Sequence, residues 1–316
     1  GIGPGETTAP VQTAAPVLES ASLRMTSRDN DCLHRFVFEQ TDVRGELVRL
    51  DASWRAVLEH QQYPAPVRDL LGEALAAVTL LSATIKFDGF LHLQLRGDGP
   101  LELVLVEVTA QRTVRGLARW SGAVPAAPLA AQVGKAWLTL TIDPGAGRER
   151  YQGLVAVEQD SLAATLEHYF RQSEQLATRL WLAADARCAA GMLLQRLPEA
   201  TPDADAWNRD VMLGATLAAS ELLTLSSREL LRRLFHEEDL RLFEPEPVSF
   251  RCRCSRERIA TVLRGLGYNE VRDILDEQGE VSVTCEFCSQ TQVFDAVDVE
   301  RLFAASDQPD VPATRH

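Results

Sequence analysis

The sequence predicts an α+β protein with three parts. These are an N-terminal mixed α/β core domain built on an antiparallel-rich sheet, a helical linker, and a small C-terminal domain rich in cysteine. Strand patterns come in runs, with helices inserted between the runs, which is typical of α+β folds rather than of alternating βαβ units. An apolar content of 46% over 316 residues is enough for one large core and a small satellite. Four of the six cysteines are confined to residues 252–288.

The core domain is expected to span residues 27–197. Leu91, Leu93 and Leu95 alternate with polar residues, a period of two that indicates a half-buried strand. The stretch 66–84 repeats apolar residues at helical spacing and predicts a core helix. Strands are expected at 36–38, 43–50, 91–95, 101–108, 113–119, 136–142, 152–157, 179–183 and 191–197, and helices at 52–61, 66–84 and from Asp160 onward.

A linker is expected over residues 198–248, because its first residues are rich in Pro, Ala and Asp. Helices are predicted at 207–225 and 227–238, and the capping box Ser226-x-x-Glu229 introduces the second. An apolar stripe runs along this second helix. It consists of Leu230, Leu231, Leu234 and Phe235. Prolines at 245 and 247 then mark the entry to the last domain.

The last domain, 249–305, is short and needs a staple such as a metal ion, because so small a core contributes little stability. Helices are expected after the caps Ser255 and Asn269, and a strand at 281–283 leads into Cys285. Residues 1–26 have no apolar periodicity and are expected to form a disordered leader, with 306–316 as a tail.

Composition excludes several classes of function. The net charge of −13 disfavours nucleic-acid binding, which requires Lys and Arg to neutralise phosphates. The apolar stretch 65–85 contains three charged residues, so it predicts a core helix and no membrane span. No secretory pattern is present, and a cytoplasmic location is expected. Since there is no phosphate-binding loop, catalytic triad or carboxylate pair, neither ATP use nor enzymatic activity is expected.

The four clustered cysteines predict a metal site. In an extended CxC segment, residues i and i+2 point to one face, so Cys252 and Cys254 can both reach one ion. A tight turn over 285–288 brings Cys285 and Cys288 together. Four thiolates around one centre favour tetrahedral zinc with bonds of about 2.3 Å. One Zn²⁺ is therefore expected in the reduced state, with an apparent binding energy on the order of 10–16 kcal/mol.

The same spacing allows the thiols to oxidise. Disulfides within each motif form most easily, although a Cys252–Cys254 bond is strained and readily reduced. Four cysteines allow three connectivities, and a crossed bond such as Cys252–Cys285 would staple the domain instead of unfolding it. A permanently closed structural zinc site is the other alternative. Cys32 and Cys188 are expected to be incidental small residues, although Cys188 follows a short loop where an oxidant could reach it.

Further motifs accompany the cysteines along the chain. They are Val43-Arg44-Gly45-Glu46-Leu47, Lys86-Phe87-Asp88-Gly89, Gln94-x-x-Gly97-Asp98-Gly99-Pro100, Tyr151-Gln152-Gly153, Ser173-Glu174-Gln175-Leu176-Ala177-Thr178, Ala189-Ala190-Gly191-Met192-Leu193-Leu194-Gln195, Leu234-Phe235-His236-Glu237-Glu238 and Cys254-Ser255-Arg256-Glu257-Arg258. With these motifs, the sequence resembles the heat-shock protein 33 family of bacterial chaperones. The family usually has Pro where Ala177 stands. The resemblance runs from about Asp31 to Phe303.

This resemblance implies a redox-regulated, ATP-independent holdase. The reduced, zinc-bound form would be poorly active. Oxidants and unfolding conditions would form the disulfides Cys252–Cys254 and Cys285–Cys288 and release zinc, and the linker would loosen. The exposed surface would bind unfolding client proteins, with homodimer formation on oxidation. From this we expect the apolar stripe to pack on the core domain in the inactive form and to bind clients when exposed.

Two alternatives come from other classes of protein. A zinc-ribbon nucleic-acid module would use the cluster Arg251, Arg253, Arg256 and Arg258, but six nearby acidic residues offset that charge. A thiol oxidoreductase would place its CxxC motif at a helix start after a strand, whereas residues 285–288 follow a predicted strand and turn.

Overall fold

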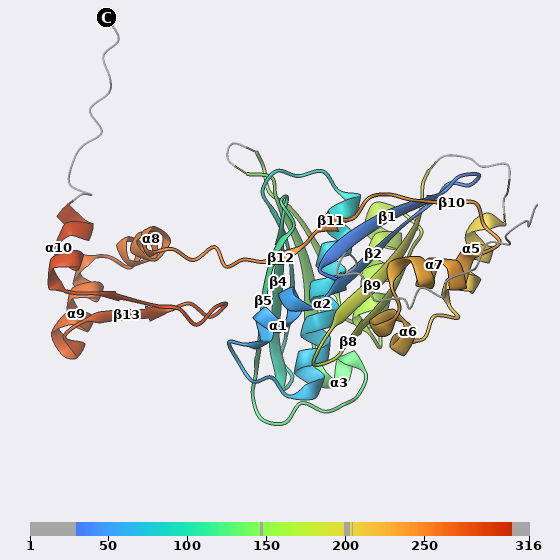
Figure 1. The fold of residues 1–316 in the computed structure, drawn as a ribbon. Helices are drawn as coiled ribbons and strands as arrows, with labels where there is room; N and C mark the ends of the chain where they lie inside the picture. Colours follow the sequence, from blue (N-terminus) through green and yellow to red (C-terminus); the bar gives the residue numbers. More distant parts are fainter. Residues whose placement is uncertain (1–29, 146–147, 199–202, 204, 305–316) are drawn as a thin grey trace, which may run out of the picture.

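One long helix lies between two β-sheets and forms the centre of the main core (Figure 1). The computed structural model describes residues 30–145, 148–198, 203 and 205–304, so the predicted leader 1–26 and tail 306–316 lie outside the described residues. The helices are α1 (Ala52–Leu58), α2 (Ala65–Thr84), α3 (Leu129–Val133), α4 (Leu162–Tyr169), α5 (Ala206–Gly214), α6 (Ala219–Thr224), α7 (Ser227–Phe235), α8 (Arg256–Leu266), α9 (Tyr268–Gln278) and α10 (Ala296–Ala304), with a π-helical turn η1 (Phe170–Glu174).

The strands form two six-stranded sheets and one hairpin. Sheet 1 has the order β10-β1-β2-β9-β8, with β11 also paired to β1, and sheet 2 has the order β12-β5-β4-β3-β6-β7. The strands are β1 (Cys32–Phe38), β2 (Val43–Leu50), β3 (Phe90–Gly97), β4 (Leu101–Thr109), β5 (Thr113–Trp120), β6 (Ala136–Asp143), β7 (Tyr151–Ala156), β8 (Thr178–Ala184), β9 (Ala189–Arg196), β10 (Leu240–Leu242), β11 (Glu246–Pro247), β12 (Ser249–Phe250), β13 (Val281–Thr284) and β14 (Thr291–Phe294). Because strands pair antiparallel except β12 with β5, the predicted α+β class is confirmed.

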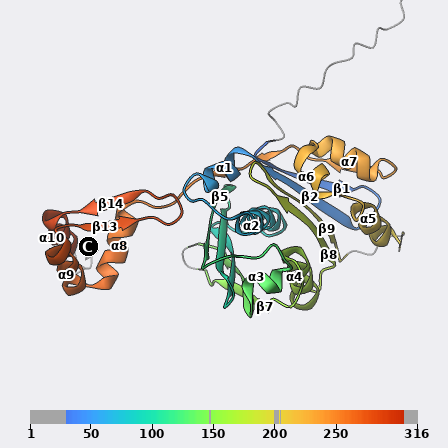
Figure 2. The same cartoon turned by 90° about the horizontal axis from the view of Figure 1, so that it is seen from below.

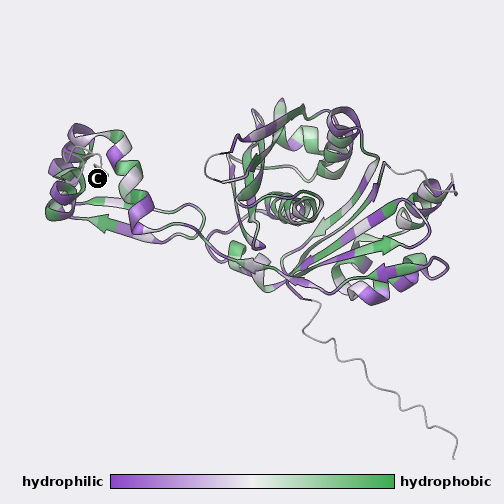
Figure 3. Cartoon of the chain, turned by 90° about the horizontal axis from the view of Figure 1, so that it is seen from above, coloured by the Kyte–Doolittle hydropathy of each residue, from purple (hydrophilic) through white to green (hydrophobic). Residues whose placement is uncertain are grey.

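Helix α2 is buried because both sheets turn an apolar face toward it (Figure 2). The helix carries mainly hydrophobic colour between the sheets in Figure 3. Gly72 permits a close approach to sheet 1, since a Cβ at this position would lie 2.4 Å from the Cβ of Ala184. Within the described residues, no helix is both long and apolar enough to cross a membrane.

Several predicted boundaries are wrong. The expected helix 207–225 is broken into α5 and α6, because Gly214 packs against Trp181 and the N–H of Ala218 is capped by the Glu221 carboxylate at 3.0 Å. Ser161, and not Asp160, caps α4 by accepting a hydrogen bond from the N–H of Ala164. The predicted cap Asn269 lies inside α9. Elements α3, η1, β14 and α10 had no counterpart in the sequence prediction.

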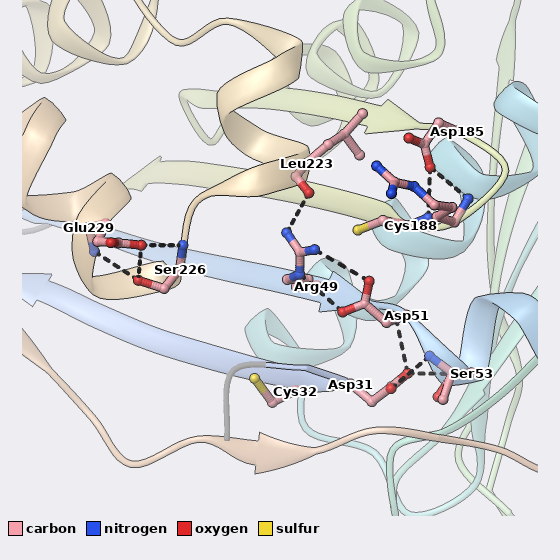
Figure 4. A network of polar contacts seen from close by, with 12 residues as sticks. Asp31, Cys32, Arg49, Asp51, Ser53, Asp185, Cys188, Leu223, Ser226 and Glu229 are labelled. Atoms are coloured by element: carbon pink, nitrogen blue, oxygen red, sulfur yellow. Dashed lines mark hydrogen bonds and ion pairs between the residues drawn. The ribbon is translucent and has the colours of Figure 1, made fainter. Parts of the chain in front are cut away.

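The outer face of sheet 1 is covered by α5, α6 and α7 (Figure 1). The apolar stripe of α7 is buried there, and the Phe235 ring lies edge-on to the Phe38 ring at a centroid distance of 5.1 Å. Arg49 of β2 links sheet 1 to the helices that cover it, because its Nη1 donates to the carbonyl of Leu223 in α6 at 2.6 Å (Figure 4). The stripe therefore packs on the core domain as expected.

A separate apolar cluster forms the small C-terminal unit. It joins α8, α9 and α10 to the β13–β14 hairpin through nine buried residues. They are Ile259, Ala260, Leu263, Val271, Leu275, Val281, Phe294, Val299 and Leu302. So small a core agrees with the expectation that this unit needs another source of stability.

Asp210 weakens the packing of α5 on sheet 1. Its side chain is fully buried, and neither carboxylate oxygen has a hydrogen-bond partner in the described part of the chain. Burial raises the pKa of Asp210 to about 7, and the neighbouring Glu238 carboxylate acts in the same direction, whereas Arg209 opposes it. A carboxyl with a raised pKa binds its proton more tightly in the packed state. Stability is therefore greatest below the ordinary pKa and falls as the pH rises through about 7.

Asp210→Asn should stabilise the packed state at pH 8 by on the order of 1–3 kcal/mol, because the amide removes the cost of a buried charge. The gain should shrink at pH 5.5, where the carboxyl is largely protonated. Thermal unfolding of both proteins at both pH values measures this difference. The exposed Asp239→Asn variant is the control and should change little. An equal gain at the two pH values would contradict the assignment.

Candidate metal centre

The first cysteine pair lies at the edge of sheet 2. Strand β12 pairs in parallel with β5, and the N–H of Arg251 donates to the carbonyl of Val114 at 3.1 Å. This pairing places Cys252 and Cys254 directly beyond the edge strand. Ser255 then caps α8 by accepting a hydrogen bond from the N–H of Arg258, so the CxC segment is held at both ends.

The second cysteine pair lies in the turn of the β13–β14 hairpin. The N–H of Cys285 donates to the carbonyl of Gln290 at 2.9 Å, and the N–H of Ser289 donates to the carbonyl of Cys285 at 2.7 Å. Ser289 takes a left-handed conformation with φ of 52° to close the turn. In this turn, Cys285 and Cys288 face the CxC segment.

The four sulfur atoms form one cluster, with every Sγ within 4.8 Å of the others. Cys252 and Cys285 are 3.6 Å apart, and Cys254 and Cys288 are 3.2 Å apart. A tetrahedron with metal–sulfur bonds of about 2.3 Å has sulfur–sulfur edges of about 3.8 Å. The donor set and spacing therefore fit a zinc ion. We call these four side chains the thiol cluster, and their role as ligands stays a prediction.

The pKa values of the thiols in this cluster also favour the binding of a metal cation. Burial raises the pKa of Cys254, and hydrogen bonds with Cys288 and Cys252 add to the effect. Burial likewise raises the pKa of Cys288. For Cys252 burial acts upward too, but hydrogen bonds from the Cys254 backbone and the neighbouring thiols bring its pKa down to about 7. Thiolates as close as these repel one another, and a divalent metal ion bound between them offsets that repulsion.

Arg253, between the first two cysteines, contacts the core domain. Its guanidinium donates to Glu107 of β4 at 2.6 Å and stacks over the Phe90 ring at 4.3 Å. Glu107 is buried and also accepts two bonds from Arg115, the residue directly opposite on β5. A charged pair in which one partner is buried and the other is half-buried is a specific contact. Sequence analysis missed Glu107, although the alternation of β4 could have placed it on the outer face.

The CxxC turn contacts the same face of sheet 2. Arg115 lies over the Phe287 ring at 4.1 Å, and Arg119 pairs with Glu286 at 2.5 Å. The hydroxyl of Ser289 donates to the carbonyl of His60 at 3.2 Å. Figure 1 shows the β13 hairpin extending toward the core domain. Both cysteine segments thus rest on the core domain, and we call these contacts, with those of Arg253, the neck interface.

An open cleft of about 570 Å³ lies between the CxxC turn and sheet 2. Its lining includes Cys285, His60, Arg119 and Trp120. A small oxidant can therefore approach Cys285 from solvent. By contrast, Cys188 is buried and its pKa is raised to about 12, chiefly by burial, so the predicted side reaction with oxidant is disfavoured.

The geometry also bears on the two alternative functions. Residues 285–288 lie between two strands and do not begin a helix, unlike the motif of thioredoxin-like oxidoreductases. Of the four clustered arginines, Arg253 pairs with Glu107 and Arg256 pairs with Asp298 at 2.6 Å. Because carboxylates pair with these two arginines, their charge is not available to neutralise the phosphates of a nucleic acid.

Comparisons with known proteins agree on one family. The family model "Hsp33 protein" matches residues 31–295. A protein of Nitrosococcus oceani named 33 kDa chaperonin is 52% identical over 292 residues, covering 92% of this chain and 100% of the relative. One of Chromobacterium violaceum with the same name is 48% identical, covering 88% and 96%.

A solved structure of similar fold is the 33 kDa chaperonin of Thermotoga maritima. It superposes with a TM-score of 0.76 at 22% identity, covering 88% of this chain and 100% of that one. This likeness concerns the fold, and the sequence matches establish the relationship. The chain belongs to the Hsp33 family, whose curated relatives are named as chaperonins and not as enzymes.

Proposed function

We propose that this protein is a redox-regulated, ATP-independent holdase of the cytoplasm that binds unfolding proteins and prevents their aggregation under oxidative stress. Membership of the Hsp33 family supports the chaperone activity. The thiol cluster supports its redox control, because one small site both organises the C-terminal unit and joins it to the core domain. Its partners are unfolded client proteins and, after oxidation, a second copy of the chain.

The path from the thiol cluster to the apolar stripe is short. Between α7 and Cys252 the chain contains only β10, β11 and β12, which are three, two and two residues long. Such short edge strands contribute few hydrogen bonds. Loss of the thiol cluster would remove the anchor at one end of this path, and the stripe lies at the other. We treat 27–197, 198–248 and 249–305 as the units that separate.

The redox step consumes two equivalents of oxidant. In each motif, one thiolate attacks peroxide to give a sulfenic acid and release water or hydroxide. The second thiolate then displaces the hydroxyl, forming Cys252–Cys254 or Cys285–Cys288. Formation of each disulfide transfers two electrons to one molecule of hydrogen peroxide. With two protons, that peroxide is reduced to two molecules of water. Disulfide sulfurs are poor ligands, so a zinc ion bound by these cysteines would be released as Zn²⁺.

The first test is light scattering by a chemically unfolded client diluted into buffer. Protein that is reduced and zinc-loaded should suppress aggregation weakly. Protein treated with peroxide at mildly elevated temperature should suppress it strongly, and a reductant with zinc should reverse the gain. Metal released on oxidation is measured with a chromophoric chelator, and about one Zn²⁺ per chain is expected. Equal suppression by both forms would mean that the metal site is purely structural.

Removing residues 249–316 should give activity without oxidant, because the truncation removes β12 and the thiol cluster together. Faster amide hydrogen exchange over α7 should accompany this activity as the stripe becomes exposed. A chain ending after Ala304 keeps the thiol cluster and serves as the control. If the truncated protein gains no activity, the stripe is not held in place by the C-terminal unit.

Weakening the neck interface should ease activation without removing a cysteine. Arg253→Leu removes the pair with Glu107 but leaves Arg115 on that carboxylate. A loss of about 1 kcal/mol should make peroxide activation about fivefold faster, with unchanged zinc stoichiometry in the reduced protein. Arg251→Leu, an exposed arginine two residues away, is the matched control. Equal rates for both variants would show that the neck interface does not restrain activation.

A further inference from the structure

A cavity of about 360 Å³ lies between the two sheets at the C-terminal end of α2. This volume falls in the range of about 300–1,000 Å³ typical of small-molecule sites. One wall is apolar and is formed by Ile85, Leu140, Ile142 and Phe170. None of the lining residues is a cysteine, so the proposed redox chemistry makes no use of this site.

One end of the cavity presents an arginine with an unused donor. Nη2 of Arg44 donates to Oε1 of Gln195 at 2.5 Å, and the Gln195 amide in turn donates to Thr178 at 2.9 Å, which fixes its orientation. The buried Nε of Arg44 has no hydrogen-bond partner among the described residues. Glu46, on the same face of β2, is buried and its pKa is raised to about 7, so it neutralises Arg44 only in part. A hydrogen-bond acceptor on a ligand would satisfy the remaining donor of Arg44.

The other charged group that lines the cavity is the exposed carboxylate of Glu174, which two tyrosines orient. Oε1 of Glu174 accepts hydrogen bonds from the hydroxyls of Tyr151 at 2.8 Å and Tyr169 at 3.0 Å. Within the described residues, no hydrogen bond or ion pair involves its second oxygen, Oε2. This oxygen can accept from a ligand cation.

The backbone at this rim takes unfavourable conformations. Glu174 ends η1, a π-helical turn that begins at Phe170, and the next residue, Gln175, has φ of 55°. Isolated π-turns and left-handed non-glycine residues cost energy and occur often at functional sites. Here they point Phe170 and Glu174 into the same cavity.

The cavity also gathers motifs for which the redox proposal has no use. Stretches 43–47, 151–153, 173–178 and 189–195 were each singled out in the sequence. They contribute Arg44, Tyr151, Glu174 with Leu176, and Gln195 to its walls. Four segments scattered over more than 150 residues thus converge on one pocket.

We infer that this cavity binds a small apolar zwitterion, an apolar amino acid or dipeptide, through Arg44 and Glu174. The ligand carboxylate accepts from Arg44, its ammonium group donates to Glu174, and its side chain packs on the apolar wall. One cation, one anion and an apolar wall that line a single cavity match the charge pattern of such a molecule. This binding activity goes beyond the chaperone function and requires no cysteine.

The test is calorimetric titration of the reduced full-length protein with the dipeptide Leu-Leu. Acetyl-Leu-Leu lacks the ammonium group, and Leu-Leu-amide lacks the carboxylate. Saturable binding of one Leu-Leu per chain is expected, and each blocked peptide should bind about tenfold more weakly. No saturable binding, or equal binding of all three peptides, would overturn the inference. Preference for acetyl-Leu-Leu would also overturn it and would identify a site for apolar carboxylates.

Two variants assign the ends of the ligand. Glu174→Gln should abolish the preference for Leu-Leu over acetyl-Leu-Leu, and Arg44→Met should abolish the preference over Leu-Leu-amide. Arg96→Met, at an exposed arginine of β3 outside the cavity, should bind like the wild type. Since Arg44 lies within sheet 1 and its loss could disturb folding, Glu174→Gln alone decides the outcome if Arg44→Met is unstable. Unchanged selectivity of Glu174→Gln would refute the assignment.

Discussion

Four sulfur atoms lie within 4.8 Å of one another at the neck of this molecule, where the C-terminal unit meets the core domain. As thiolates they repel, and as thiols two of them are partly or wholly buried with raised pKa values. A divalent cation removes the conflict, because it converts repulsion into four bonds to one centre. Oxidation of the thiolates to disulfides would remove the negative charges and, with them, the ligands of the cation.

The neck interface explains why a local event in the thiol cluster can reach the core domain. Arg253 lies between two of the cysteines, and its partner Glu107 belongs to a central strand of sheet 2. Buried ion pairs tolerate little misalignment, because an unpaired buried charge is costly. Displacement of the CxC segment would therefore break its contact with the core domain as well as its contacts within the thiol cluster.

Stability is distributed unevenly along the chain. Helix α2 is sandwiched between two sheets and has thirteen buried residues, ten of which belong to the main apolar core. By contrast, helices α5 to α7 cover only one face of sheet 1, and Asp210 buries an uncompensated carboxyl there. The layer most easily released is thus the one that carries the apolar stripe. The cavity at the end of α2 is lined by none of the residues of α5 to α7, so ligand binding there would not require the release of that layer.

The sequence by itself determined many of the helices and strands and which four cysteines form the thiol cluster. Alternation such as that of Leu91, Leu93 and Leu95 predicted the strands, and the spacing of the cysteines predicted the thiol cluster, because both depend on local backbone geometry. Only the tertiary structure decided that the strands form two sheets around α2, that the helical stretch breaks at Gly214, and that Arg253 meets Glu107. These features join residues far apart in the chain, and local periodicity carries no information about which distant partner a side chain will meet.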